Sequence, residues 1–325
     1  MISVLECTST ADVAAEMEKL SCGAASGFGR VMNLIAVIPH ENQIDDAIEI
    51  CGAASREHPC RVIIVVESPE STDDSLTAQI HYGDEIGPSE VIVLLPGGQT
   101  ASELDTLVMP LLLADTPIVV YWPQTPPLSP IDHPLGSIAT RRITDSRSTE
   151  DAIGTLRNLA RVHTNGDSDL SWAGVTLWRG LLAAMLDEKP RRPIDHVEVV
   201  GCETHPSGYL IAVWLRSQLD VPVHFQAAEV ATVCAVRFLN QDGTELALTR
   251  EDGSSVAKLH RPNLPTTNVN LPRRSLSDCL MEDLRRLDPD EHYGEIIRSD
   301  LNPDEISTPQ DPASPRTIFS GKRID

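Results

Sequence analysis

The 325-residue sequence predicts an α/β protein in which a mostly parallel sheet domain is followed by an α+β domain. The apolar runs of the first half are continuous and do not alternate with polar residues, which is typical of parallel strands that helices cover on both faces. Segments with helical periodicity separate several of these runs. In the second half, Asp242-Gly243 and Asp252-Gly253 separate apolar runs and indicate antiparallel hairpins.

The first domain is expected at residues 31–147, after an N-terminal extension of residues 1–30. Its expected strands are 32–38, 62–66, 78–82, 91–95 and 118–121, with a last edge strand at 142–144. A helix is expected over 44–54, where apolar residues recur at positions i, i+3, i+4 and i+7. Residues 102–113 are expected to be partly helical, with Pro110 as an interruption. This order predicts a Rossmann-like, mostly parallel sheet.

The second domain is expected at residues 148–300 and begins with a helix over 150–163 and a longer one over 170–186, capped by Asp169. Next comes a βαβ unit with the elements 196–200, 207–219 and 223–227. An antiparallel meander follows, with strands at 230–239, 245–249, 256–260 and 268–271. Two closing helices are expected, one with leucines at 276, 280, 284 and 287, the other with Asp288 as N-cap. Residues 301–325 are rich in Pro, Ser and Asp and are expected to be disordered.

The charge and the cysteines restrict the possible partners. A formal net charge of -22 repels phosphate backbones and anionic lipids, so we expect neither a nucleic-acid nor a membrane partner. The seven cysteines are odd in number, which argues against a closed disulfide framework, and they form no C-x-x-C. No signal peptide is visible. Together these observations favour a cytoplasmic protein with reduced thiols. The ten histidines show no zinc-binding spacing, and we expect no metal and no cofactor.

A polar strip, residues 55–61, runs directly into an apolar strand and includes His58 and Cys60. One interpretation is a thiolate nucleophile activated by an imidazole, and a related one is a redox-active Cys60. The other interpretation is a strand entry whose polar groups bond within the fold. Both residues precede their strand, whereas ligands bind beyond the carboxyl ends of the strands in open α/β sheets. Topology therefore favours the strand entry.

Gly97 and Gly98 follow a predicted strand and precede a helix, where a glycine turn can bind an anion. The loop contains no lysine, so it is not a P-loop, and no G-x-G-x-x-G follows any strand. The alternative to an anion site is a plain loop in which Ser102 caps a helix. If the loop does bind anions, the chain could be a small-molecule binding protein or an enzyme that acts on a sugar phosphate or nucleotide.

Several residues suggest a surface for a protein partner, since tryptophan and arginine are enriched in interfaces. The candidates are Trp178, Arg179, Arg273, Arg274, Arg285 and Arg286. For each, a packing role or a solvated helix face is the alternative. The sequence contains no P-loop, no G-x-G-x-x-G after a strand, no H-E-x-x-H and no G-x-S-x-G, which favours a binding or regulatory protein.

Four strips of sequence are similar, in this order, to one protein family. They are residues 55–62, 108–113 with 115–123, 167–172 with 177–179, and 272–274 with 279–280, 284–291 and 293–295. Together they resemble the OpcA family, the glucose-6-phosphate dehydrogenase assembly proteins of bacteria, over roughly residues 30 to 300. The resemblance implies a non-catalytic protein that binds this dehydrogenase, promotes its active oligomer or modulates its activity, and so affects NADPH supply. It carries over no active-site residues. Read as a strand entry, the strip 55–61 leaves polar groups available for pairing within the fold or with a partner, so Arg56, Glu57 and His58 are further candidates for the partner surface.

Overall fold

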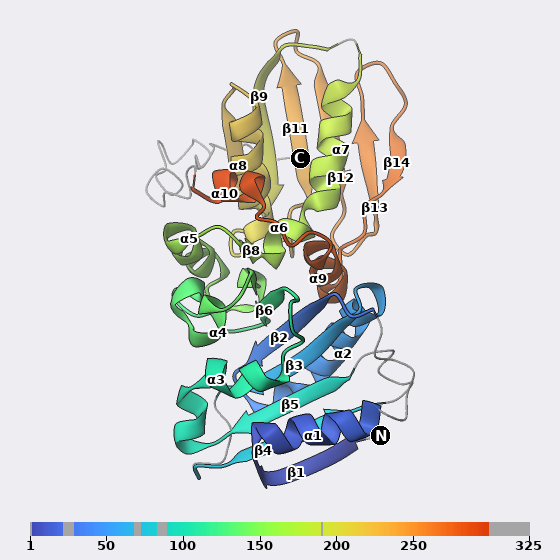
Figure 1. The fold of residues 1–325 in the computed structure, drawn as a ribbon. Helices are drawn as coiled ribbons and strands as arrows, with labels where there is room; N and C mark the ends of the chain where they lie inside the picture. Colours follow the sequence, from blue (N-terminus) through green and yellow to red (C-terminus); the bar gives the residue numbers. More distant parts are fainter. Residues whose placement is uncertain (1, 22–28, 68–72, 83–89, 190, 299–325) are drawn as a thin grey trace. The chain divides into compact units, whose positions relative to one another are not determined.

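The structure is a computed structural model that describes residues 2–21, 29–67, 73–82, 90–189 and 191–298 (Figure 1). Its contacts divide the chain into two compact units. The first unit comprises Met1–Thr149, Thr164–Leu170 and Ser275–Asp290, and the second comprises Glu150–His163, Ser171–Arg274 and Glu291–Asp325. The sequence placed the boundary after residue 147, without the two later segments that return to the first unit. The predicted disordered tail, 301–325, lies outside the described residues.

The first unit contains an eight-stranded sheet with the order β1-β4-β5-β3-β2-β6-β7-β8. The strands are β1 Ile2–Thr8, β2 Met32–Ile38, β3 Cys60–Val66, β4 Leu76–His81, β5 Val91–Pro96, β6 Ile118–Trp122, β7 Arg141–Thr144 and β8 Asp167–Asp169. The strands from β5 to β8 in this order are parallel, whereas β4 and β1 add antiparallel pairs at one edge. The predicted α/β fold with a mostly parallel sheet is confirmed.

Helices pack on both faces of this sheet, as the continuous apolar runs predicted. Alternate residues such as Ile35, Ile63 and Ile92 join α1 (Thr10–Ser21) and α3 (Leu104–Val108) in one core. Strand residues between them point to the opposite face, and α2 (Ile44–Glu57) contacts β2 and β3 and packs beside α9 (Leu276–Leu284). Shorter elements complete the unit: α4 Pro134–Ser137, η1 Glu41–Gln43, η2 Gly98–Ser102, η3 Met109–Leu111, η4 Pro130–Asp132 and η5 Ser146–Ser148.

Three local expectations for this unit were wrong. Residues 2–21 of the expected extension form β1 and α1, and β1 pairs with β4. The expected edge strand at 142–144 is internal, because β8 pairs with β7 beyond it. The single long helix expected over 170–186 is divided into α6 (Leu170–Gly174) and α7 (Thr176–Asp187), and the carboxylate of Asp169, directly before α6, accepts from Thr144 and Ser146.

The second unit contains a six-stranded sheet with the order β10-β9-β11-β12-β13-β14. Its strands are β9 Ile194–Gly201, β10 Val223–Ala227, β11 Ala235–Asn240, β12 Glu245–Arg250, β13 Val256–His260 and β14 Thr267–Asn270. β9 and β10 are parallel around α8 (Pro206–Gln218), and the remaining pairs are antiparallel, so both the βαβ unit and the meander are confirmed. The Asp-Gly turns form as predicted, with Gly243 at φ +78° and Gly253 at φ +76°, in the left-handed region that favours glycine.

Helices cover one face of this second sheet. Alternate strand residues such as Val197, Phe238 and Leu248 share a core with Trp178 of α7 and Leu210 of α8. The helices α5 (Ala152–Val162) and α10 (Glu291–Arg298) also contact α8. The last helix begins at Glu291, and not directly after the predicted cap, Asp288.

Candidate functional site

The parallel strands of the first unit have the order of a dinucleotide-binding sheet, with β2 in the middle and β3-β5 and β6-β7-β8 running outward. In such sheets ligands bind beyond the carboxyl ends of the strands, where the order reverses, here between β2 and β6. A ligand of this sheet would therefore be expected at this edge.

Side chains at this edge bind one another. After β2, the side chain of Gln43 donates to that of Gln124, which follows β6. After β3, Glu67 lies 2.8 Å from Nε2 of His133, and the His133 ring packs edge-on against Trp122 with centroids 5.3 Å apart. The turn after β2, residues 39–43, contains no glycine with which to cradle a pyrophosphate. The edge thus has the topology of a nucleotide site without its phosphate-binding turn.

The strip that enters β3 is tied into the first unit by its own bonds. His58 Nε2 lies 2.9 Å from the carbonyl oxygen of Met281 in α9. Cys60 is 0% exposed, and burial raises the pKa of its thiol to about 12, despite a hydrogen bond to Ser55 that lowers it. A thiol that stays protonated at neutral pH is a poor nucleophile. The contacts support the strand-entry interpretation over the catalytic one.

The Gly97-Gly98 loop has backbone donors on both sides of Gly98 engaged within the unit. Gly97 N donates to Ser75 O at 2.8 Å, and Gln99 N donates to a carboxylate oxygen of Asp74 at 2.6 Å. A neighbouring cavity of about 540 Å³ is bordered by Thr100 and Glu103, and neither lysine nor arginine lines it. The carboxylates of Asp74 and Glu103 carry negative charge beside this loop and would repel a bound anion. The anion site stays a prediction, and the local charge is against it.

Three of the predicted interface residues are engaged inside the second unit. Trp178 is 2% exposed and offers almost no surface to a partner. The guanidinium of Arg179 lies 3.5 Å from the centroid of the Trp172 ring, a cation–π contact. Arg274 donates to the carbonyl oxygen of Ala173 at 2.9 Å. These contacts account for the three side chains as packing groups.

The remaining candidates are exposed. Arg56 and Glu57 end α2, while Arg285 and Arg286 directly follow α9. The bond between His58 and Met281 places the end of α2 beside the last turn of α9, so the two helix ends lie side by side. We call these four residues the helix-end patch. Arg273, also exposed, pairs with Asp252 in the second unit.

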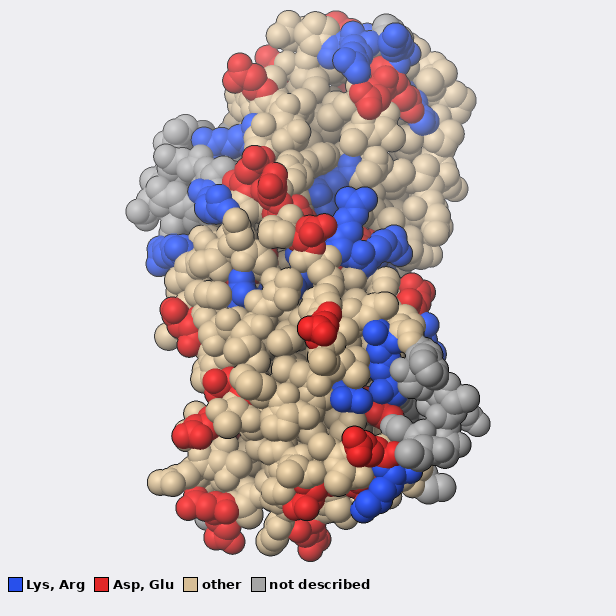
Figure 2. All heavy atoms as spheres, in the orientation of Figure 1, with Lys and Arg blue, Asp and Glu red and all other residues tan. Residues whose placement is uncertain are grey.

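Sequence reasoning missed another basic group, formed by Lys189, Arg191, Arg192 and Arg261. The first three lie within four positions of one another in a strongly acidic chain, which was a readable signal. Arg261 joins them only because β13 ends near the end of α7, where Arg261 binds Glu188. Figure 2 shows that cationic side chains gather in groups on the drawn face.

The described residues contain neither a candidate metal site nor a helix that could cross a membrane. Across the described ranges, no group of three or more His, Cys, Asp or Glu side chains is arranged to hold a metal ion. Within the same ranges, every helix is too short or too polar to cross a bilayer.

Comparison with solved structures gave a biliverdin reductase from Synechocystis sp. PCC 6803, in complex with biliverdin and NADP+. The identity is 8%, the match covers 83% of this chain and 96% of that chain, and the TM-score is 0.36, too low to carry an argument. Comparison with curated proteins gave no match.

Comparison with protein families gave two matches in chain order. Residues 51–161 match the N-terminal domain of the glucose-6-phosphate dehydrogenase subunit family, and residues 165–297 match the C-terminal domain of the same family. The two matched ranges include the helix-end patch, the six-stranded sheet and every strand of the eight-stranded sheet except β1 and β2. The chain therefore belongs to the OpcA family of glucose-6-phosphate dehydrogenase subunits.

Proposed function

We propose that this protein is a non-catalytic accessory subunit that binds glucose-6-phosphate dehydrogenase and promotes its active oligomer or modulates its activity. The observation that carries the proposal is the match of both family domains, in order, over residues 51–161 and 165–297. The engaged side chains at the carboxyl edge of the first sheet and the buried, protonated Cys60 add support, because they leave the strongest catalytic candidates occupied.

A population shift is the physical mechanism. A protein that binds the active oligomer more tightly than the inactive forms stabilises that oligomer by the difference in binding free energy. No group of this chain needs to touch the reacting atoms. The proposed location in the cell is the cytoplasm, where the dehydrogenase would act on its substrate and cofactor.

The helix-end patch is the proposed docking surface. Arg56, Arg285 and Arg286 present three cations at two adjacent helix ends of the first unit. In a chain with a net charge of -22, such a patch can select an acidic surface on the partner and orient it, while the rest of the chain repels acidic surfaces.

The test is to mix the purified protein with purified glucose-6-phosphate dehydrogenase and to measure both mass, by light scattering, and dehydrogenase rate. We expect a complex of higher mass and a changed rate. Unchanged mass together with an unchanged rate would overturn the proposal.

A charge-reversal pair tests the docking surface separately. Arg285→Glu with Arg286→Glu is expected to weaken association about tenfold at low salt, because exposed interfacial charges mainly set the association rate. Lys19→Glu, a charge reversal at an exposed position in α1 of the same unit, is the control and should bind like wild type. If both variants bind alike, the patch is not the docking surface even though the complex exists.

A further inference from the structure

A pocket of about 400 Å³ opens in the second unit, at the end of the six-stranded sheet where α7 stops. Its walls come from five places in the chain: the end of α7 with the segment that follows it, the beginning of β9, Leu219 directly after α8, the paired strands β11 and β12, and the segment after β13. Such a volume is within the range of small-molecule sites. All of these elements belong to one compact unit, so the pocket does not depend on the other.

The floor of the pocket is apolar. Leu186, Ile194, Leu219 and Leu246 are only partly buried and pack against the core, and Phe238 lies beneath them. Leu264, at the rim, is 58% exposed. Partly covered aliphatic side chains gathered in a concave surface gain free energy when an apolar group displaces the water over them.

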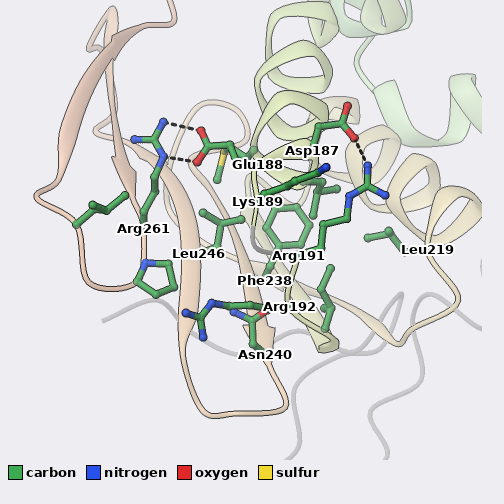
Figure 3. A pocket seen from close by; sticks show the side chains of 15 residues that line it. Asp187, Glu188, Lys189, Arg191, Arg192, Leu219, Phe238, Asn240, Leu246 and Arg261 are labelled. Atoms are coloured by element: carbon green, nitrogen blue, oxygen red, sulfur yellow. Dashed lines mark hydrogen bonds and ion pairs between the residues drawn. The ribbon is translucent and has the colours of Figure 1, made fainter.

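The rim of the pocket is cationic. Arg261 holds Glu188 with two parallel bonds of 2.7 and 2.8 Å, and this pairing keeps the pKa of Glu188 below its usual range. Figure 3 shows this pair at one side of Leu246 and Phe238 and the Arg191–Asp187 pair, 2.8 Å apart, at the other side. The negative charges of the two rim carboxylates, Glu188 and Asp187, are thus neutralised by Arg261 and Arg191.

Cationic groups remain available after this pairing. Lys189 is exposed and forms no ion pair within the described part of the chain. Arg191 is bound to Asp187 through one nitrogen, and a guanidinium carries five N–H donors. The rim can therefore receive an additional negative charge above the apolar floor.

We propose that this pocket binds a small amphipathic anion: an apolar body of one or two rings, or a short alkyl chain, that carries one carboxylate or phosphate group. The apolar body would lie on Leu219 and Leu246, and the anionic group would meet Lys189 and Arg191. A free sugar phosphate does not fit this description, because its hydroxyl groups would find aliphatic side chains in place of hydrogen-bond partners. The inference concerns the isolated chain and is independent of the dehydrogenase.

The experiment is calorimetric titration of the full chain with 1-naphthyl phosphate and with 1-naphthoate, which present the same rings with two different anionic groups. The neutral compound 1-naphthol is the comparison. We expect saturable binding of at least one anionic probe at one site per chain, at least tenfold tighter than that of 1-naphthol. The tighter of the two anions identifies the head group.

Two variants at exposed positions locate the binding without threatening the fold. Lys189→Ala is expected to weaken the anionic probe about three- to tenfold and to leave 1-naphthol unchanged, since it removes a rim cation and none of the leucines of the floor. Leu264→Asp is expected to weaken all probes, because it adds a carboxylate at the apolar rim. Lys258→Ala, an exposed lysine outside the pocket, is the matched control and should change nothing.

Two results would overturn the inference. One is the absence of saturable binding of both anionic probes to the wild-type chain. The other is binding of the anionic probe that Lys189→Ala leaves unchanged, whether or not Leu264→Asp weakens it, because the anionic group would then not meet Lys189 at the rim.

Discussion

At the scale of single residues, the buried carboxylates of the first unit bind the protein itself. Asp169 is 1% exposed and accepts from the hydroxyl of Thr144 at 2.7 Å and from the backbone N and hydroxyl of Ser146 at 2.9 and 2.8 Å. The carboxylate thus fixes the turn after β7 against the end of β8. Its position beyond a parallel strand resembles that of a catalytic acid, but its oxygens are already occupied.

Removing this carboxylate should destabilise the fold. We expect Asp169→Ala to lower the free energy of unfolding by about 2–4 kcal/mol, because three donors lose their buried acceptor. Urea denaturation followed by circular dichroism measures the change. Asp187→Ala, at an exposed position, is the control and should stay within about 0.5 kcal/mol of wild type. A small effect of Asp169→Ala would contradict the structural role.

The thiol of Cys60 predicts a dependence of stability on pH. Its pKa rises from an ordinary value of 9.0 to about 12 in the folded protein, chiefly through burial. A group whose folded pKa is raised contributes stability that is fully present below its unfolded pKa and is lost as pH rises toward its folded pKa. Between pH 8 and pH 10 we therefore expect Cys60 to account for about 1 kcal/mol of lost stability.

The measurement compares wild type with Cys60→Ala at both pH values. The variant should be less stable at pH 8, because it leaves a small cavity, but it should lose less stability on going to pH 10. Equal losses in the two proteins would show that Cys60 does not titrate in this way. Burial also raises the pKa of Cys51, which Cys60→Ala leaves in place in both arms of the comparison.

At the scale of elements, a buried ion pair attaches α9 to β7 in the first unit. Arg141 of β7 is 3% exposed and donates to both oxygens of Asp283, at 2.9 and 2.8 Å, while Ser168 of β8 donates to the same carboxylate at 2.7 Å. A planar guanidinium that binds a carboxylate through two bonds fixes geometry as well as energy. The helix is thereby attached to two strands that precede it by more than a hundred residues.

Breaking this attachment should cost more than weakening the helix itself. Asp283→Ala is expected to lower the free energy of unfolding by about 3–5 kcal/mol, because the buried guanidinium of Arg141 loses the carboxylate that neutralises it. Ser275→Ala removes the N-cap bond to Asp278 N and should cost about 1 kcal/mol. Denaturant unfolding of both variants gives the comparison, and equal losses would mean that the ion pair does not anchor α9.

Local patterns predicted elements well where the elements are long and regular. The strand at 32–38 and the strand at 223–227 have the predicted bounds, and both Asp-Gly turns form. β8 was missed because Asp167, Ser168 and Asp169 have no strand propensity, and they are extended only because β7 pairs with them. α6 and α7 are divided at Val175, within a helical spacing of apolar residues that predicted a single helix.

At the scale of the whole molecule, the chain leaves the first unit and returns to it twice, at Thr164–Leu170 and at Ser275–Asp290. Each return supplies a carboxylate to a buried arginine. Asp167 binds Arg142, and Asp283 binds Arg141. The first unit is therefore incomplete without segments that lie within and after the sequence of the second.

This interleaving predicts the behaviour of a fragment. A chain of residues 1–161, which ends where the N-terminal family match ends, lacks β8 and α9 and leaves two buried arginines without their carboxylates. We expect it to show no cooperative thermal unfolding by circular dichroism, whereas the full chain does. Cooperative melting of the fragment near the temperature of the full chain would contradict the prediction.

The sequence by itself determined the α/β class, the continuous buried strands, the βαβ unit and the hairpins, because these follow from periodicity and turn residues within short windows. Its long strips also identified the family that the domain matches show. The tertiary structure decided which polar residues are used and how. His58 and Cys60 bond inside the fold, Trp178 is buried, and Lys189 lies on the rim of an apolar pocket. These roles depend on neighbours that folding brings from distant parts of the chain. The spacing of residues along the sequence does not predict such contacts.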